Sequence, residues 1–543
     1  MSGLKQFFRR GDPFIWLTGS ALGTCLLLIG GLIVVILVNG LGYFWPRPLV
    51  KATLTDGTAV LGELAAREAI PDPGTPNHLK KHRVQIKVGN RELTGADFRW
   101  LRDDEITALE NPPEAVSVER REYGAFFGFP KVLKDGDTEL ASGFGLLAAL
   151  GPRLAQAARD RDEIRRLEKG DIGEINRQLE LVRLDLRGLD LRKDDPDVAE
   201  RRRELTEKAA RAEELYKQKQ AELQTVYERA ARGAVVFTAV DGQEKELRLL
   251  DVYRVYPTNA LGRFQRARIY FGRLWGFMMD DPREANTEGG IFPAIFGTVM
   301  MVMIMSIAVV PFGVIAALYL REYAREGVML RVVRIAVNNL AGVPSIVYGV
   351  FGLGFFVYFV GGSIDRIFYP ERLPTPTYGT GGILWASMTL ALLTVPVVIV
   401  AAEEALAAVP RSMREASVAV GATKFQTILR VVLPAAAPGI LTGMILAMAR
   451  GAGEVAPLMI TGVVKLAPEL PLDGVFPFFH LERKFMHLGF HVYDVGFQSP
   501  NVEAAKPMVY MTTIFLLLII ILLNLTAILV RNHLRKKYRT SAF

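Results

Sequence analysis

Six stretches of the chain are apolar enough and long enough to cross a lipid bilayer. A membrane-spanning helix needs about 20 residues, because each residue advances about 1.5 Å through a hydrocarbon layer roughly 30 Å thick. The six stretches are 14–38, 292–320, 335–360, 382–402, 436–460 and 508–530. The first follows Lys5, Arg9 and Arg10, but it is much longer than the apolar core of about 7–15 residues that a signal peptide has. The pattern therefore predicts an uncleaved anchor helix at 14–41.

A long polar insertion, residues 42–290, separates the first span from the second. Within it a heptad seam runs through Ile172, Ile175, Leu179, Val182, Leu186 and Leu189. The seam stops at an Asp-Asp-Pro-Asp turn, 194–197, and a second helical stretch follows. We expect a helical hairpin over about 154–232, with strand-like segments at 83–88 before it and 234–239 after it. The insertion is therefore predicted to be an α+β domain.

Lysine and arginine are concentrated at one end of the predicted spans. The positive-inside rule then places both termini in the cytoplasm and the insertion in the periplasm. Residues 1–13 form a cytoplasmic tail in this topology, and 532–543 form a second, basic one. The net charge of +8 gives no reason to expect nucleic acid as a partner, because the basic residues flank membrane spans.

Composition excludes several other classes of protein. Half of the 543 residues are hydrophobic and 22% are charged, so the chain is neither disordered nor embedded in the membrane throughout. The single cysteine, Cys25, lies in an apolar run, which excludes an intrachain disulfide and a cysteine-based metal site. No G-x-x-x-x-G-K-[ST] loop occurs, so we expect no nucleotide and no other cofactor on this chain.

Two histidine pairs have the spacing of metal ligands on a helix, His78 with His82 and His487 with His491. No carboxylate completes either set, and both pairs lie in polar segments. We therefore expect solvated loop histidines and no metal site. No catalytic set of residues is visible, and the chain is not expected to be an enzyme.

The fifth span contains two ionisable residues, Arg450 and Glu454, four residues apart. On a continuous helix they would share one face. An arginine at this depth is costly in lipid and is expected to face the bundle interior or a water-filled path. One interpretation is an ion pair that only fixes helix packing. The other is a cation that meets an anion in transit, with Glu454 orienting the guanidinium and with Gly451 and Gly453 allowing close approach.

The segment 403–434 is too polar to span the membrane and is predicted to form two short helices interrupted at Gly421. Such a unit between two spans presents a small amphipathic surface to a partner, although ordinary interfacial helices have the same pattern. Its sequence resembles the coupling loop of bacterial ABC-importer permeases, E-A-A-x3-G-x9-I-x-L-P. The matching residues are Glu415, Ala416, Gly421, Leu433 and Pro434, with Ser417 and Val431 as mild departures.

Three further runs resemble the phosphate-importer permeases of the PstA type. They are Ala-Leu-Tyr-Leu-Arg-Glu-Tyr-Ala at 317–324, Leu-Ala-Gly-Val-Pro-Ser-Ile-Val-Tyr-Gly at 340–349 and Arg-Gly-Ala-Gly-Glu-Val-Ala-Pro-Leu at 450–458. Val455 stands where the family usually has threonine. The resemblance covers about 291–531 and does not extend to the insertion.

The resemblance implies an α-helical polytopic inner-membrane protein with six transmembrane helices and a type I ABC-importer permease core at 291–531. It also implies that the chain is one permease subunit of an ATP-driven phosphate importer. The expected partners are a homologous PstC-like permease, two PstB-like ATPase subunits that carry ATP and magnesium, and a PstS-like periplasmic phosphate-binding protein. Arg450 and Glu454 would lie on the translocation path, and the loop 403–434 would couple it to the ATPase.

The residues are also compatible with two other functions, and two segments have expected contacts of their own. Arg450 would serve any tetrahedral oxyanion, so a permease for sulfate or molybdate is the nearer alternative. A membrane-anchored receptor is a remote one, because no large cytoplasmic output domain is present. The hairpin in the insertion is expected to contact the binding protein or the sister permease, and the first span to wrap around the sister permease.

Overall fold

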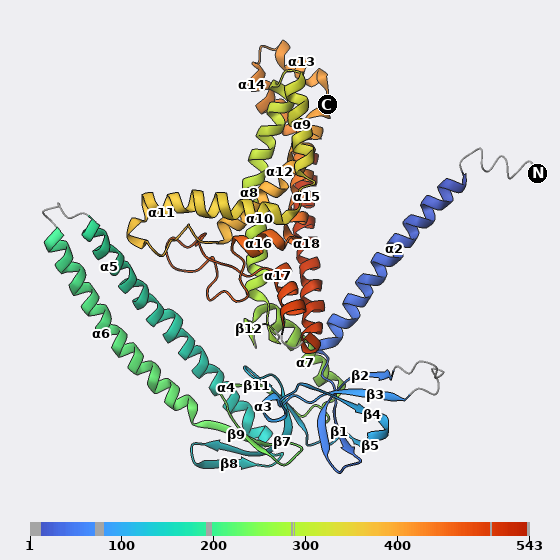
Figure 1. Ribbon diagram of the computed structural model, residues 1–543, viewed down its shortest axis with the longest axis vertical. Coiled ribbons are helices and arrows are strands. Elements are labelled where there is room, and N and C mark those ends of the chain that lie inside the picture. The colour runs from blue at the N-terminus through green and yellow to red at the C-terminus, as the bar shows by residue number, and fades with distance from the viewer. Residues whose placement is uncertain are drawn as a thin grey trace, which may run out of the picture.

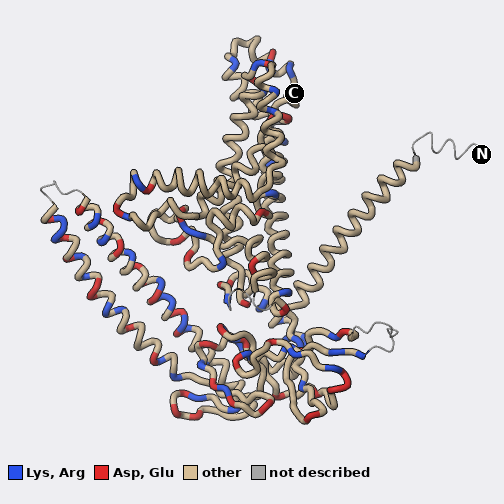
Figure 2. The backbone as a smooth tube through the Cα atoms, viewed as in Figure 1, with Lys and Arg blue, Asp and Glu red and all other residues tan. Residues whose placement is uncertain are grey.

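The computed structural model describes residues 12–70, 81–191, 198–283, 286, 288–499 and 502–539. The tail 1–11, the expected turn at 194–197, His78 and residues 540–543 lie outside the described residues. The chain forms a bundle of long helices, with the insertion at one end of it (Figure 1). Figure 2 shows charged residues along the insertion, its helical arm included, and at the opposite end of the bundle, with fewer along the long helices between.

Six helical segments of the described chain are long and apolar enough to cross a membrane, which confirms the six predicted spans. Four are built on single helices: α2 (Asp12–Leu41), α8 (Phe292–Leu318), α12 (Ile383–Ala407) and α18 (Val502–Arg539). The fifth span, Lys424–Gly453, joins α14 (Lys424–Thr427), the π-helical segment η9 (Ile428–Val432) and α15 (Leu433–Gly453). The third span joins α10 (Ser345–Phe351), the π-helical segment η7 (Gly352–Gly361) and α11 (Gly362–Phe368). The helices α8, α12, α15 and α18 run along the bundle, and the third span crosses it at α10 and projects sideways at α11 (Figure 1). The helix α2 diverges from the bundle and touches it only near its end.

Two of the predicted spans end elsewhere than expected. The third was predicted at 335–360, but residues 335–340 belong to a separate helix, α9 (Val328–Leu340). The chain breaks before Pro344, which is extended (φ −55°, ψ 135°), because proline disfavours helical backbone in the residue before it. The fifth was predicted at 436–460, but α15 ends at Gly453 and a short helix, α16 (Ala456–Thr461), follows.

Small residues hold α8, α12 and α15 close together. A methyl group on Gly313 of α8 would lie 2.6 Å from the Val398 side chain, and one on Gly443 of α15 would lie 2.6 Å from Ala401. Such contacts are typical of membrane helices, which associate by close packing and not by a hydrophobic driving force. The fully buried Met301, Met305, Val309, Leu390, Ala447 and Phe485 fill the centre of the bundle.

The described part of the insertion contains two large antiparallel sheets and a two-stranded one, β12 (Pro282–Arg283) paired with β13 (Glu288–Gly289). The first has the order β4-β3-β2-β1-β5, and the second has β10-β9-β7-β6-β11 with β8 paired to β7. The strands are β1 (Leu49–Leu54), β2 (Ala59–Ala69), β3 (His82–Lys87), β4 (Phe98–Arg102), β5 (Ile106–Glu110), β6 (Val116–Arg120), β7 (Phe126–Asp135), β8 (Thr138–Ser142), β9 (Gly233–Thr238), β10 (Glu244–Arg248) and β11 (Val252–Tyr256). The expected segments 83–88 and 234–239 correspond to β3 and β9.

A long helical arm leaves the second sheet between β8 and β9. It runs out through α4 (Leu146–Arg165), η4 (Arg166–Ile172) and α5 (Gly173–Leu191), and returns through α6 (Val198–Ala231). The heptad residues Ile172 and Ile175 are buried, and the other four are half-buried, where α5 packs against α6. The arm leans back toward the bundle (Figure 1), where α5 contacts the turn Pro370–Arg372 that follows α11.

The helix α7 (Arg263–Met279) lies at the foot of the bundle and connects the sheets to α8 (Figure 1). Phe277 of α7 is buried between Phe44, 5.3 Å away between ring centres, and Phe515 of α18, at 5.7 Å. This contact joins the insertion to the ends of the first and sixth spans.

Candidate functional site

Two interrupted helices meet inside the bundle. One interruption lies between α9 and α10, the other between α15 and α16, and α10 packs directly on α16. A methyl group on Gly349 of α10 would lie only 2.7 Å from the Cα of Pro457 in α16. The Tyr348 hydroxyl donates to the Leu340 carbonyl at 2.7 Å, which satisfies an acceptor that the end of α9 leaves free. Irregular backbone is tolerated at membrane depth when protein surrounds it in this way.

Arg450 and Glu454 lie at the second interruption. Their nearest atoms, Nε and Oε1, are 3.9 Å apart. The pair was expected on one face of a continuous helix, which is wrong. Glu454 is extended (φ −77°, ψ 140°), so the two side chains approach each other around the end of α15. Helix ends release backbone that a continuous helix would constrain, and here the chain turns so that the carboxylate still faces the arginine.

The guanidinium of Arg450 is not committed to a partner. A distance of 3.9 Å is too long for a hydrogen bond, and no other described residue accepts one from Arg450. The side chain keeps 35% of its surface exposed, and that of Glu454 keeps 22%. An arginine presents five N–H donors in a planar fork that matches an oxyanion. The site therefore has the donors to receive an anion.

The two glycines beside this pair have different surroundings. A methyl group on Gly451 would lie 2.5 Å from the sulfur of Met305, so Gly451 is needed for the packing of α15 on α8. One on Gly453 would meet nothing within 4 Å. The second glycine therefore borders open space next to Arg450 and Glu454.

His487 lies in the segment between the fifth and sixth spans, near the end of α15. It caps the helix α17 (Leu488–Tyr493), because its Nδ1 accepts hydrogen bonds from the backbone of Gly489 at 3.1 Å and Phe490 at 3.4 Å. This arrangement leaves the proton on Nε2. Nε2 has no hydrogen-bond partner among the described residues. The backbone of Ala452, in the last turn of α15, favours the charged form of His487 and so raises its pKa, but by less than burial lowers it.

The expectation that His487 and His491 are solvated is wrong. Both are buried, and burial lowers the pKa of each to about 4. His491 lies 3.3 Å from the hydroxyl of Thr512 on α18. The segment carrying both histidines folds back against the bundle, where Met486 and Leu488 join a buried apolar cluster. His82, in contrast, is exposed at the start of β3. No group of three or more ligand side chains that could hold a metal occurs among the described residues.

The loop 403–434 lies at the far end of the bundle from the insertion (Figure 1). It contains two short helices, α13 (Arg411–Ala419) and α14 (Lys424–Thr427). Gly421 between them has φ +90°, a conformation that other residues adopt only with strain. The hydroxyls of Ser417 and Thr427 lie 2.9 Å apart and link the two helices. The departure at Ser417 from the ABC-permease pattern thus adds a contact within the loop.

The loop presents apolar side chains to its surroundings. Those exposed are Met413, Val418, Val420, Phe425 and Leu429. Glu415, Ala416 and Gly421 are also exposed, whereas Leu433 and Pro434 are half-buried in the first turn of α15. A cluster of exposed apolar residues with a polar rim is typical of a protein interface.

Ion pairs that the sequence did not predict attach this loop to the bundle. Arg414 donates to the Leu406 carbonyl at 2.6 Å and pairs with Glu322 at 3.2 Å. Lys424 lies 4.8 Å from the ring centre of Tyr323. Glu322 and Tyr323 belong to the run 317–324 that suggested the family. That run could therefore have indicated where the loop attaches to the bundle.

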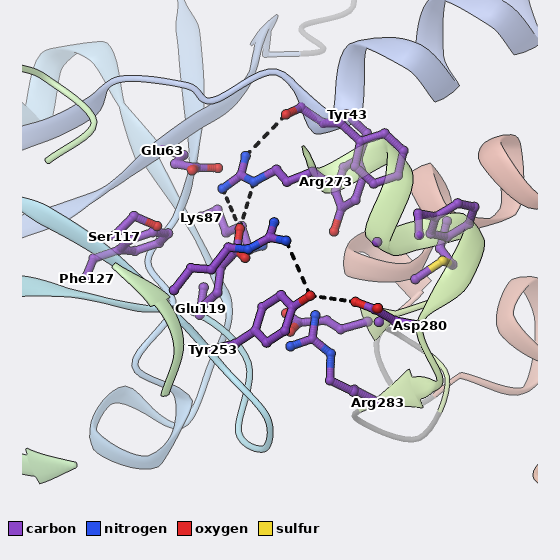
Figure 3. A pocket seen from close by; sticks show the side chains of 18 residues that line it. Tyr43, Glu63, Lys87, Ser117, Glu119, Phe127, Tyr253, Arg273, Asp280 and Arg283 are labelled. Carbon is purple, nitrogen blue, oxygen red and sulfur yellow. Dashed lines mark hydrogen bonds and ion pairs between the residues drawn. The ribbon is translucent and has the colours of Figure 1, made fainter. Parts of the chain in front are cut away.

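A second polar site lies where the insertion meets the bundle (Figure 3). It is a cavity of about 120 Å³. In it Arg273 contacts Glu119 at 2.7 Å, and the Tyr253 hydroxyl donates to Asp280 at 2.5 Å. Burial opposes ionisation of Glu119, but Arg273 and Arg254 outweigh it and hold the pKa of Glu119 below its usual value. Four cations (Lys87, Arg254, Arg273 and Arg283) face four carboxylates (Glu63, Glu119, Asp280 and Glu288). This balance suits a structural joint better than an anion site.

Comparison with known proteins identifies the family. The family described as "Binding-protein-dependent transport system inner membrane component" matches residues 309–540. The probable ABC transporter permease protein YqgI of Bacillus subtilis (strain 168) is 30% identical over 223 residues, which cover 40% of this chain and 70% of that protein. The chain belongs to this family of transport-system membrane components.

Two further relatives match a similar region. The probable ABC transporter permease protein YqgH of Bacillus subtilis (strain 168) is 32% identical over 195 residues, 36% of this chain and 59% of that protein. The phosphate transport system permease protein PstA 1 of Mycobacterium tuberculosis (strain CDC 1551 / Oshkosh) is 38% identical over 172 residues, 32% of this chain and 51% of that protein. The chain thus spans little more than half the length of these two relatives.

The family match includes every site residue that the sequence suggested. Arg450 and Glu454 meet at the end of α15, and the five loop residues lie around α13, Gly421 and the start of α15. His487, Glu322 and Arg414 lie in the same region and were not predicted. The insertion precedes the matched residues 309–540 and has to be explained from its own contacts.

Proposed function

We propose that this chain is the permease subunit of an ATP-driven importer of inorganic phosphate and forms half of its translocation path. The observation that carries the proposal is Arg450, a cation inside a membrane bundle that has one distant carboxylate and no hydrogen-bond acceptor among the described residues. A membrane protein tolerates such a group at a site of ion passage. A tetrahedral oxyanion fits the guanidinium fork, and the name of the PstA 1 relative favours phosphate over sulfate or molybdate.

Coupling to ATP hydrolysis is assigned to the loop 403–434. Its exposed Val418, Val420 and Phe425 offer a docking surface for a separate ATPase subunit, which would carry ATP and magnesium. The Arg414–Glu322 pair would pass movement of the loop on to α8. In this arrangement the loop and both termini are cytoplasmic, and the insertion is periplasmic, where a phosphate-binding protein of the PstS type delivers the anion.

The first span is proposed to cover a homologous, PstC-like permease chain. The side chains of α2 are exposed along nearly its whole length. Only its end touches the bundle, where Gly40 lies close to Met511 and Ile514 of α18. A partner helix or lipid has to cover so long an apolar surface.

Phosphate uptake tests the proposal. Cells lacking their own high-affinity importer would receive this chain with its partner subunits, and radiolabelled phosphate uptake would be measured with sulfate and molybdate as competitors. We expect uptake that resists both competitors and is lost in Arg450→Gln, with the complex still assembled. Arg366→Gln, which removes an exposed arginine of α11, is the matched control and should transport normally.

Each adverse outcome has its own meaning. Normal uptake by Arg450→Gln would show that Arg450 serves only to fix helix packing. Inhibition by sulfate or molybdate would reassign the substrate to another oxyanion. Failure of the unaltered chain to transport any of the three would overturn the proposed function.

The arm is proposed to contact the binding protein or the sister permease. Its neighbours β8 and β9 both pair with β7, so a short linker from residue 145 to 232 would replace the arm and leave both sheets intact. A larger deletion would remove Phe277 and Arg273 and disrupt the foot of the bundle. Unchanged transport kinetics and an intact complex after removal of the arm alone would refute this role.

A further inference from the structure

The helix α7 has two faces with different surroundings. On one face Tyr270, Leu274 and Phe277 pack into the apolar cluster at the foot of the bundle. On the other face Phe264, Arg268, Phe271, Trp275 and Met279 recur every three or four residues. Phe264 is 85% exposed, Phe271 65% and Trp275 63%. A row of large exposed aromatic side chains marks a surface that is covered in the working protein.

The exposed face of α7 is also cationic. The helix contains Arg263, Arg266, Arg268 and Arg273 and no acidic residue. Arg273 is paired with Glu119, and Arg266 donates to the carbonyls of Thr258 and Leu261. Arg263 and Arg268 are exposed and form no ion pair among the described residues. The exposed face therefore offers aromatic rings and the guanidinium group of Arg268, and the guanidinium group of Arg263 is exposed at the start of the helix.

Contacts with the membrane spans fix where α7 lies. Phe277 packs on Phe44, the last residue of the first span, and on Phe515 of the sixth. Trp45 follows the first span directly, is partly exposed, and lies 5.9 Å from Tyr270 of α7 between ring centres. Tryptophan and tyrosine gather where spans leave the hydrocarbon. The helix α7 thus lies beside the first and sixth spans, with its aromatic face turned away from them.

We propose that the exposed face of α7 binds the bilayer surface on the side of the membrane that carries the insertion. Phe264, Phe271 and Trp275 enter the boundary between headgroups and acyl chains, as the apolar face of an interfacial helix does. Arg263 and Arg268 bind the phosphates of anionic phospholipid headgroups, for which guanidinium is well shaped. The lipid surface then fixes the position of α7 and the adjoining sheets relative to the membrane, and the helical arm extends from these sheets.

Spin labelling of the full chain in nanodiscs tests the position of this face. With the native Cys25 replaced (Cys25→Ser), a nitroxide would be attached through Phe271→Cys. Leu215→Cys, on an exposed position of the arm, is the matched control. We expect the label at 271 to be more accessible to membrane-soluble oxygen than to a water-soluble nickel chelate, and the label at 215 to show the reverse. A label at 271 that behaves like the one at 215, or that is shielded from both reagents by protein, would overturn the proposal.

The headgroup preference is tested by titrating phosphatidylglycerol into phosphatidylcholine nanodiscs while the mobility of the label at 271 is measured. Each basic side chain near an anionic surface contributes about fivefold to binding, so Arg263→Gln with Arg268→Gln should weaken headgroup binding about 25-fold and raise the half-saturating phosphatidylglycerol fraction accordingly. Arg166→Gln with Arg187→Gln removes the same charge from exposed positions of the arm and should cause no shift. Equal behaviour of the two double variants would refute specific headgroup binding. Neither experiment depends on transport, so the result stands apart from the proposed function.

Discussion

Acid is expected to destabilise the packing of α17 against α8 and α18, because two buried histidines must gain a proton there. Burial holds the pKa of His487 and of His491 at about 4, against about 6.5 in an unfolded chain. Between these values the unfolded state binds more protons than the folded state, so stability falls as the pH falls. The loss is complete below pH 4, and none occurs above about pH 7.

The size of the effect follows from the two pKa values. Between pH 7 and pH 5 each histidine should cost about 2 kcal/mol of unfolding free energy, or about 4 kcal/mol together. The groups that act on His491 are Asp494, which favours its charged form, and Lys465, which disfavours it. Because these two charges act in opposite directions, desolvation remains the dominant cause of the lowered pKa. A change in salt concentration should therefore alter the pH dependence of the unfolding free energy little.

The assay is thermal unfolding of the full chain in detergent at pH 7 and pH 5. His487→Asn is the informative variant, because asparagine keeps an acceptor for the first turn of α17 but does not titrate. It should lose about half of the pH dependence, and the double variant with His491→Gln should lose most of it. His82→Asn, at an exposed position, is the control and should keep the full dependence. A double variant with the same pH dependence as the unaltered chain would refute the reasoning.

Three further predictions concern the bundle and its loop. Gly421→Ala should strain the loop by about 1–2 kcal/mol, since φ is +90°, and should lower transport-coupled ATP hydrolysis with little change in melting temperature. Gly297→Ala would place a methyl group 2.1 Å from the Met486 carbonyl and should reduce the unfolding free energy by about 1–3 kcal/mol, whereas Gly354→Ala, in open space, should not. Glu454→Gln should lower KM and kcat for phosphate together, because Arg450 then retains the anion more tightly; a raised KM in uptake assays would contradict this.

The sequence predicted what depends on local pattern. Six apolar stretches of sufficient length identify the six spans, since only helices of that length satisfy their backbone in lipid. The two-helix loop around Gly421 was recognisable from helix-forming residues on both sides of a glycine. Heptad spacing likewise indicated the seam between α5 and α6, because side chains at that spacing share a face whatever the rest of the protein does.

The sequence could not predict what depends on distant contacts. The order of the first sheet places β1 between β2 and β5, and no local pattern specifies that β5 pairs there. His487 was expected in solvent because it lies in a polar segment between two spans. Its burial follows from the way the whole segment folds back against α8 and α18. The helix breaks before Ser345 and after Gly453 could not be predicted from hydropathy. Hydropathy measures how apolar a stretch is and does not show whether its helix is continuous.

The break after Gly453 explains how an arginine can lie in the bundle and still have free donors. On a continuous helix, Glu454 would stand one turn from Arg450 and could engage the guanidinium directly. With α15 ended at Gly453, the carboxylate lies at 3.9 Å, close enough to offset the charge but too far to take up a hydrogen bond. Arg450 also stands in the last turn of α15, where the helix dipole favours a cation. The charge is thus stabilised from two sides by groups that occupy none of its N–H donors, and the donors remain open to an anion.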